Sequence, residues 1–137
     1  MPDQSFRTFL GNLEQQGEIV RFTKEVDPLA NMSAVEWKTY NELGKSSLFT
    51  NIKGYPGWQA VSQILADRKK WSIAIGVDEI ELIPTLVDRI RREVEPVMVD
   101  AADAPVKQVI LMGKDADLTK IPAMWTSEKD PSPYIAS

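Results

Sequence analysis

The spacing of apolar residues changes between a helical and a strand-like period several times along the chain, and this alternation most constrains the fold. The first helical stripe consists of Phe6, Phe9, Leu10 and Leu13. Their spacing predicts a helix, with Asp3 or Ser5 as its N-cap and Gly17 just past its end. The short apolar run at residues 19–22 then predicts a strand.

The same alternation continues through the next forty residues. A second helix is expected to begin near Asn31 or Ser33, which are both good capping residues, and to stop at Gly44. Residues 47–52 and 59–65 each predict a strand, and a turn rich in glycine and proline separates them.

Two further helices are expected before the middle of the chain gives way to a linker. Asp67 can cap a short helix that Gly76 closes. The longest stripe consists of Ile80, Ile83, Val87, Ile90 and Val94. A proline inside a helix costs roughly 3 kcal/mol, so Pro84 is expected in the first turn, with the helix beginning near Leu82 and Pro96 ending it.

The remaining third of the chain has a weaker pattern. Residues 101–105 predict a linker and residues 106–112 a strand, after which periodicity is lost. The order of elements predicts a mixed α/β (α+β) domain: a small mixed sheet flanked by helices, with an extended C-terminal tail. We expect residues 1–113 to form this domain and residues 114–137 to be a connector that docks outside the chain. Trp125 on that tail is expected to pack against the absent partner.

Composition excludes several kinds of chemistry. The chain has no cysteine and no histidine, which excludes disulfides, thiolate metal sites and Ser-His-Asp triads within it. Net charge is −4 with no basic patch, so nucleic acid and anionic membranes are not expected partners. The sequence shows neither a signal peptide nor an apolar run of membrane-spanning length, and a cytoplasmic location is expected.

Carboxylates and tryptophans offer candidate sites, each with a simpler interpretation. Asp115 and Asp117 are spaced to share a metal, but Asp is also common in loops because it forms Asx-turns. The acidic run at 78–81 suits a metal or the first turn of a helix, where the dipole favours acids. Core or domain-interface packing is the expected role of the other tryptophans, which are Trp37, Trp58 and Trp71.

Five short motifs lie at residues 5–10 with 17–19, 25–28, 48–54, 105–122, and 125 with 133–135. Their order and spacing resemble the N-terminal part of UbiD-like decarboxylases. The resemblance covers nearly the whole chain. Residues 129–133 stand where the family has a Gly-Gly pair before Pro-Tyr, so a different loop shape is expected there.

The resemblance implies a reversible decarboxylase of aromatic, heteroaromatic or α,β-unsaturated acids. Family members use prenylated FMN, bound through manganese and potassium, and the cofactor carries the difficult chemistry. A flavin prenyltransferase supplies the cofactor, and full-length members form homo-oligomers. The family's catalytic and metal-binding residues lie beyond the Pro-Tyr-Ile element, so no residue here is assigned those roles and none of these groups is expected on this chain alone. Ser137, where the flavin-binding domain should begin, is the candidate cofactor contact.

Three hypotheses follow. In the first, the chain is the N-terminal scaffold of such an enzyme and is inactive by itself. In the second, it is a complete non-catalytic subunit or binding module that pairs with a separate catalytic chain. In the third, it is an unrelated small-molecule-binding domain with similar motifs.

Overall fold

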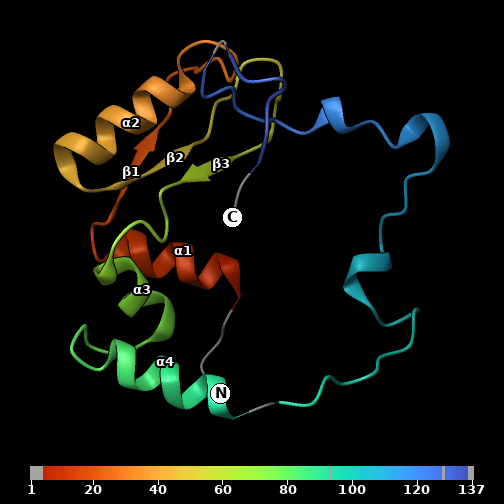
Figure 1. Ribbon diagram of the computed structural model, residues 1–137. Helices are drawn as coiled ribbons and strands as arrows, with labels where there is room; N and C mark the ends of the chain where they lie inside the picture. Colours follow the sequence, from red (N-terminus) through yellow and green to blue (C-terminus); the bar gives the residue numbers. More distant parts are fainter. Residues whose placement is uncertain (1–4, 93, 128, 136–137) are drawn as a thin grey trace.

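The computed structural model describes residues 5–92, 94–127 and 129–135 of the chain. These residues form helices beside a small mixed sheet, so the expected α/β class is confirmed. Figure 1 shows a helix beside the sheet and a separate group of helices at one end of it. The helix beside the sheet is α2 (Met32–Leu43), and the group is α1 (Phe6–Gln15), α3 (Arg68–Ile75) and α4 (Leu82–Arg91).

The sheet has the order β1-β2-β3 and combines both kinds of strand pairing. β1 (Ile19–Phe22) lies parallel to β2 (Ser46–Phe49), and α2 supplies the crossover that a parallel pair requires. β3 (Ala60–Ser62) pairs antiparallel with β2, whose four residues are all buried. β2 and β3 are shorter than the strands predicted at residues 47–52 and 59–65. β3 ends where Gln63 adopts φ 57° and its side-chain amide donates to the buried Glu36 carboxylate at 2.5 Å.

The sequence offers an N-cap for α1, α2 and α3, and in α1 and α3 the predicted residue caps the helix. Ser5 accepts a hydrogen bond from the backbone N–H three residues on, at 3.2 Å, and Asp67 does the same for α3 at 3.0 Å. Asn31 precedes α2 but does not cap it, because its side-chain oxygen accepts from the backbone N–H of Asp27 at 2.8 Å. The other candidate cap, Asp3, lies outside the described residues.

The helix C-termini are set by glycines and, in one case, differ from expectation. α2 and α3 end at Gly44 and Gly76, whose φ values of 66° and 77° a residue with a side chain rarely adopts. α4 has Pro84 in its first turn, as predicted. It ends at Arg91 rather than continuing to Pro96, so the last residue of its apolar stripe lies beyond the helix.

The hydrophobic core lies between the sheet, α2 and the turn that follows β2. Its buried members are Val26, Met32, Phe49 and Ile52. Phe49 is fully buried and its ring stacks on that of Phe22, with centroids 5.3 Å apart. Burying one such side chain contributes about 1.5–3 kcal/mol, so this cluster carries much of the stability of the sheet.

Part of the C-terminal tail returns to this core, contrary to expectation. Pro122 is buried, Met124 packs against the core cluster, and the backbone N–H of Trp125 donates to the carbonyl of Pro28 at 3.0 Å. Figure 1 shows the blue tail lying beside the turns at one end of the sheet. The prediction that the tail docks only on something outside the chain is therefore wrong for this stretch, and Trp125 is half-buried within the chain itself.

The expected strand at 106–112 does not form within the described residues. Residues 105–107 adopt a short 3-10 helix, η1 (Pro105–Lys107), and the residues after it pair with no strand described here. This part of the chain projects away from the body before it returns (Figure 1). A strand needs a partner to satisfy its backbone, and the described part of the chain supplies none.

Candidate functional site

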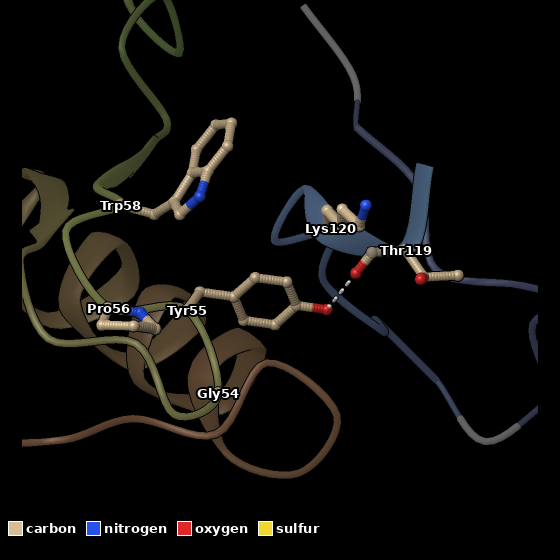
Figure 2. A pocket seen from close by; sticks show the side chains of 6 residues that line it. All are labelled: Gly54, Tyr55, Pro56, Trp58, Thr119 and Lys120. Atoms are coloured by element: carbon tan, nitrogen blue, oxygen red, sulfur yellow. Dashed lines mark hydrogen bonds between the residues drawn. The ribbon is translucent and has the colours of Figure 1, made fainter. Parts of the chain in front are cut away.

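Two neighbouring pockets meet at Tyr55, which lies in the turn after β2. The first has a volume of about 440 Å³ and is lined by Gly54, Tyr55, Pro56, Trp58, Thr119 and Lys120. Figure 2 shows the turn on one side and the short 3-10 helix η3 (Leu118–Lys120) on the other. The Tyr55 hydroxyl donates to the carbonyl oxygen of Thr119 at 3.1 Å, which links two segments 64 residues apart in sequence.

The local sequence explains why this turn presents aromatic side chains. Gly54 has φ 82°, and the N–H of Tyr55 donates to the carbonyl of Ile52 at 3.0 Å, which closes a tight turn. A second hydrogen bond, from the N–H of Trp58 to the carbonyl of Tyr55 at 3.2 Å, continues the bend. Two aromatic rings are thus held a few residues apart at the rim of the pocket.

The second pocket, of about 580 Å³, shares Tyr55 and Thr119 with the first and is mainly apolar. It is lined by Leu29, Tyr55, Leu118, Thr119, Ile121, Ala123, Trp125, Pro133, Tyr134 and Ile135. An antiparallel bridge between Met124 and Tyr134 closes the tail into a loop, and Thr126 Oγ1 donates to the Tyr134 hydroxyl at 2.9 Å. The Asp130 carboxylate accepts from the backbone N–H groups of Thr126 and Ser127 at 3.2 and 2.9 Å and holds this loop in shape.

The chemistry available at these pockets suits the binding of an apolar or aromatic surface. The lining residues provide one ammonium group, two phenols and apolar surface, and none of them carries a carboxylate. Within the ranges that the structure describes, no three acidic, histidine or cysteine side chains gather closely enough to hold a metal ion. The pockets can therefore hold an apolar or aromatic surface, and they offer no set of metal ligands.

The carboxylates singled out from the sequence have structural roles. Asp117 caps η3: its Oδ1 accepts from the hydroxyl and the N–H of Thr119 at 2.7 and 2.9 Å. The hydrogen bond from the Thr119 hydroxyl is the largest cause of a lowered pKa at Asp117, and the one from the Thr119 N–H is the next. The Asx-turn interpretation of this aspartate is thus confirmed, and neither it nor the acidic run at 78–81 belongs to a metal cluster in the described residues.

The other expected site residues divide between the surface and the undescribed end. Trp37, Trp58 and Trp71 are exposed, so core packing within this chain is wrong for all three. Ser137, the candidate cofactor contact, lies outside the described residues and stays a prediction. No helix among the described residues is long and apolar enough to cross a membrane.

An ion cluster around the buried Lys70 of α3 was missed by sequence reasoning. Lys70 is 0% exposed, and its ammonium group donates to the Asp67 carboxylate and to the carbonyl of Gly44 at 2.6 Å. Glu18 Oε2 lies 3.7 Å from the Lys70 ammonium, and Glu18 Oε1 accepts from Lys69 at 2.5 Å. Burial opposes ionisation of Asp67, but hydrogen bonds from the side chain and the N–H of Lys70 prevail and its pKa is lowered.

The comparisons with known proteins agree on one family. The model of the 3-octaprenyl-4-hydroxybenzoate carboxy-lyase N-terminal domain matches residues 10–90, more than half of the chain. Anhydromevalonate phosphate decarboxylase of Methanosarcina mazei is 30% identical over 133 residues, which are 97% of this chain and 29% of that protein.

Two solved structures share the fold. An evolved dimeric form of the UbiD-class enzyme HmfF from Pelotomaculum thermopropionicum, in complex with prFMN, matches 97% of this chain and 30% of its own, with 29% identity and a TM-score of 0.82. The closed form of vanillic acid decarboxylase from Sedimentibacter hydroxybenzoicus matches 98% of this chain and 30% of its own, with 26% identity and a TM-score of 0.83.

These matches define the class of the chain as the N-terminal domain that the family model describes, with an α/β fold. The chain belongs to the UbiD family, whose N-terminal domain it carries. It spans about 30% of the length of these relatives.

Proposed function

We propose that this chain is the N-terminal scaffold of an enzyme that reversibly decarboxylates an aromatic, heteroaromatic or α,β-unsaturated acid with prenylated FMN. The observation that carries this proposal is the match of 97% of the chain to the prFMN complex of HmfF. In this proposal residues 1–113 form the N-terminal domain and residues 114–137 connect it to a flavin-binding domain.

The described residues do not fit the role of cofactor site. They contain no cluster of metal-ligating side chains, and the two pockets at Tyr55 offer a single ammonium group. We therefore assign no catalytic step to them. The proposal places prenylated FMN, manganese and potassium with the remaining part of the enzyme, with Ser137 as the one candidate contact from this chain.

Three exposed tryptophans support a scaffolding role. Trp37, Trp58 and Trp71 expose large apolar rings, which are common where a surface is covered by a partner. Because the chain spans about 30% of its relatives, the remaining polypeptide is the proposed cover, and a cytoplasmic homo-oligomer is the proposed state of the whole enzyme.

The first experiment is the denatured mass of the protein as its native gene expresses it. A mass well above the 15.4 kDa of this chain is expected. A mass equal to that value would reject the hypothesis that the chain is part of a longer enzyme. The hypothesis of a non-catalytic subunit would then replace it.

The second experiment tests the activity of that native protein. It is produced with and without a flavin prenyltransferase, and CO2 release is measured from a panel of aromatic, heteroaromatic and α,β-unsaturated acids. Release that depends on the prenyltransferase supports the proposal. If the protein holds the prenylated cofactor but releases CO2 from none of these acids, the proposal is refuted.

A further inference from the structure

A single tight turn holds two aromatic side chains at the first pocket. Tyr55 and Trp58 are the first and last residues of this turn, with Pro56 and Gly57 between them. The N–H of Trp58 donates to the carbonyl of Tyr55 at 3.2 Å, and Gly57 has φ 81°, which the third position of a type II turn requires. Because such a turn brings its first and last residues close together, the phenol and the indole border the same pocket (Figure 2).

The opposite wall of this pocket carries a cation. Lys120 is the last residue of η3, which the hydrogen bond from the Tyr55 hydroxyl to the Thr119 carbonyl joins to the turn at 3.1 Å. Figure 2 shows Lys120 across the pocket from Trp58. The Lys120 ammonium forms an ion pair with none of the carboxylates that the structure describes. The pocket thus has an unpaired positive charge beside two aromatic rings.

The acid at the start of η3 is engaged elsewhere. Asp117 Oδ1 accepts from the hydroxyl and the N–H of Thr119 at 2.7 and 2.9 Å, so this carboxylate caps η3 and does not pair with Lys120. None of the described residues that line the pocket is acidic. An anionic ligand would therefore meet a positive charge at the wall and no carboxylate in the lining.

These groups match the two parts of an aromatic carboxylate. An aromatic ring can pack edge-to-face or offset against Tyr55 and Trp58, while the carboxylate accepts a charge-assisted hydrogen bond from the Lys120 ammonium. The indole N–H of Trp58, whose side chain is 45% exposed, is a second donor at the pocket. A single ammonium suits a ligand with one negative charge. The volume of about 440 Å³ lies within the roughly 300–1,000 Å³ of small-molecule sites.

We propose that the pocket between Tyr55, Trp58 and Lys120 binds a small aromatic monocarboxylate. The ligand belongs to the class of acids that the proposed enzyme consumes or forms, and in this respect the inference rests on the proposed function. This chain leaves Trp58 half exposed, so the remaining polypeptide proposed to cover it supplies the outer wall of the pocket. Small-molecule sites occur preferentially at such boundaries between domains.

Photolabelling of the complete native polypeptide with 4-azidobenzoate, read by mass spectrometry of its peptides, tests this inference. We expect label on peptides that cover residues 54–58 or 118–120, and we expect excess benzoate to suppress it. The neutral 4-azidobenzamide should label the same peptides about fivefold less, as the loss of one solvent-exposed charge pair predicts. Absence of label from both peptides, label that excess benzoate does not reduce, or equal labelling by the two probes would each overturn the inference.

Two pairs of matched variants test the cation and the aromatic wall. Lys120→Met should lower labelling by 4-azidobenzoate about fivefold and leave labelling by 4-azidobenzamide unchanged, because it removes the charge and keeps the apolar stem. Trp58→Ala should lower labelling by both probes. Lys114→Met and Trp37→Ala are the controls, since both residues are exposed and lie outside the pocket, and their labelling should equal that of the native protein. Native labelling of Lys120→Met by 4-azidobenzoate would overturn the inference.

The result separates this inference from the proposed function because photolabelling requires neither turnover nor CO2 release. A protein that is labelled as expected but releases no CO2 refutes only the proposed function. An active enzyme whose peptides at 54–58 and 118–120 stay unlabelled refutes only the aromatic-acid pocket.

Discussion

The buried lysine of α3 yields the sharpest stability prediction. Lys70→Ala removes three methylenes from a fully buried side chain, which costs roughly 2 kcal/mol at about 0.8 kcal/mol each. It also leaves the Gly44 carbonyl and the Asp67 carboxylate without the ammonium that they share, for about a further 1–2 kcal/mol. The expected loss in the free energy of unfolding is therefore about 3–4 kcal/mol.

Two companion variants separate packing from charge. Lys70→Met keeps the length of the apolar stem and removes the charge, and replacing a buried ion by an apolar isostere costs far less than truncating it. We expect a loss of about 1–2 kcal/mol. The neighbouring Lys69 carries the same side chain but is half exposed, and its pair with Glu18 lies at the surface side of the cluster. Lys69→Ala should therefore lower the stability less than either Lys70 variant, because solvent screens its ion pair.

Urea denaturation followed by tryptophan fluorescence measures all three. With a slope of about 2 kcal/mol per molar, Lys70→Ala should lower the midpoint by roughly 1.5–2 M. The essential result is the order of the fall in the urea midpoint: largest for Lys70→Ala, smaller for Lys70→Met and smallest for Lys69→Ala. Equal midpoints for Lys70→Ala and Lys69→Ala would refute the reasoning, because burial would then contribute nothing.

Three further outcomes are expected. Asp67 has a lowered pKa in the folded state, so its stabilisation is present above about pH 4 and is lost as pH falls through the folded-state value; Asp67→Asn should flatten this loss in urea midpoints measured across acidic pH. The pKa of Asp27 is lowered chiefly by its hydrogen bond from Lys53 at 2.7 Å, so Lys53→Met should raise it toward its ordinary value in an NMR titration, and an unchanged value would contradict the pair. Phe49→Ala should cost about 3–5 kcal/mol by calorimetry or urea, whereas the exposed Phe6→Ala should change little; similar losses would mean that the core is misplaced.

Local signals predicted the helices and turns well. Gly44 and Gly76 end α2 and α3 because each helix end needs one residue with a left-handed backbone, which glycine adopts most easily. A glycine at such a position can be recognised from the sequence. Pro84 likewise fixed the start of α4. Each of these features depends on a few neighbouring residues, which is why sequence reasoning found them.

Features that join distant segments were not predictable in this way. The contact between Tyr55 and Thr119 and the return of Met124 to the core each join residues far apart in sequence, and no local pattern specifies the partner. The ion cluster of Lys70 was hidden for the same reason, since a lysine in a helix is normally solvated. A capping aspartate three residues before Lys70 was the one local signal.

The expected strand at 106–112 shows the opposite case, in which a local pattern was present without its partner. Its residues favour extended structure, but pairing is decided by what lies alongside, and nothing in the described residues does. The tryptophans follow the same logic: aromatic content predicts burial, and the covering surface decides whether burial occurs.

The return of the tail to the core also bears on how the length of the chain can change. The segment between α4 and Met124 is a loop whose two ends are both held by the body of the protein. The entropy cost of closing a loop grows only with the logarithm of its length. Doubling it would cost about 0.6 kcal/mol. Residues 97–104, which form no regular helix or strand, are thus the place where insertions and deletions can accumulate without loss of the fold.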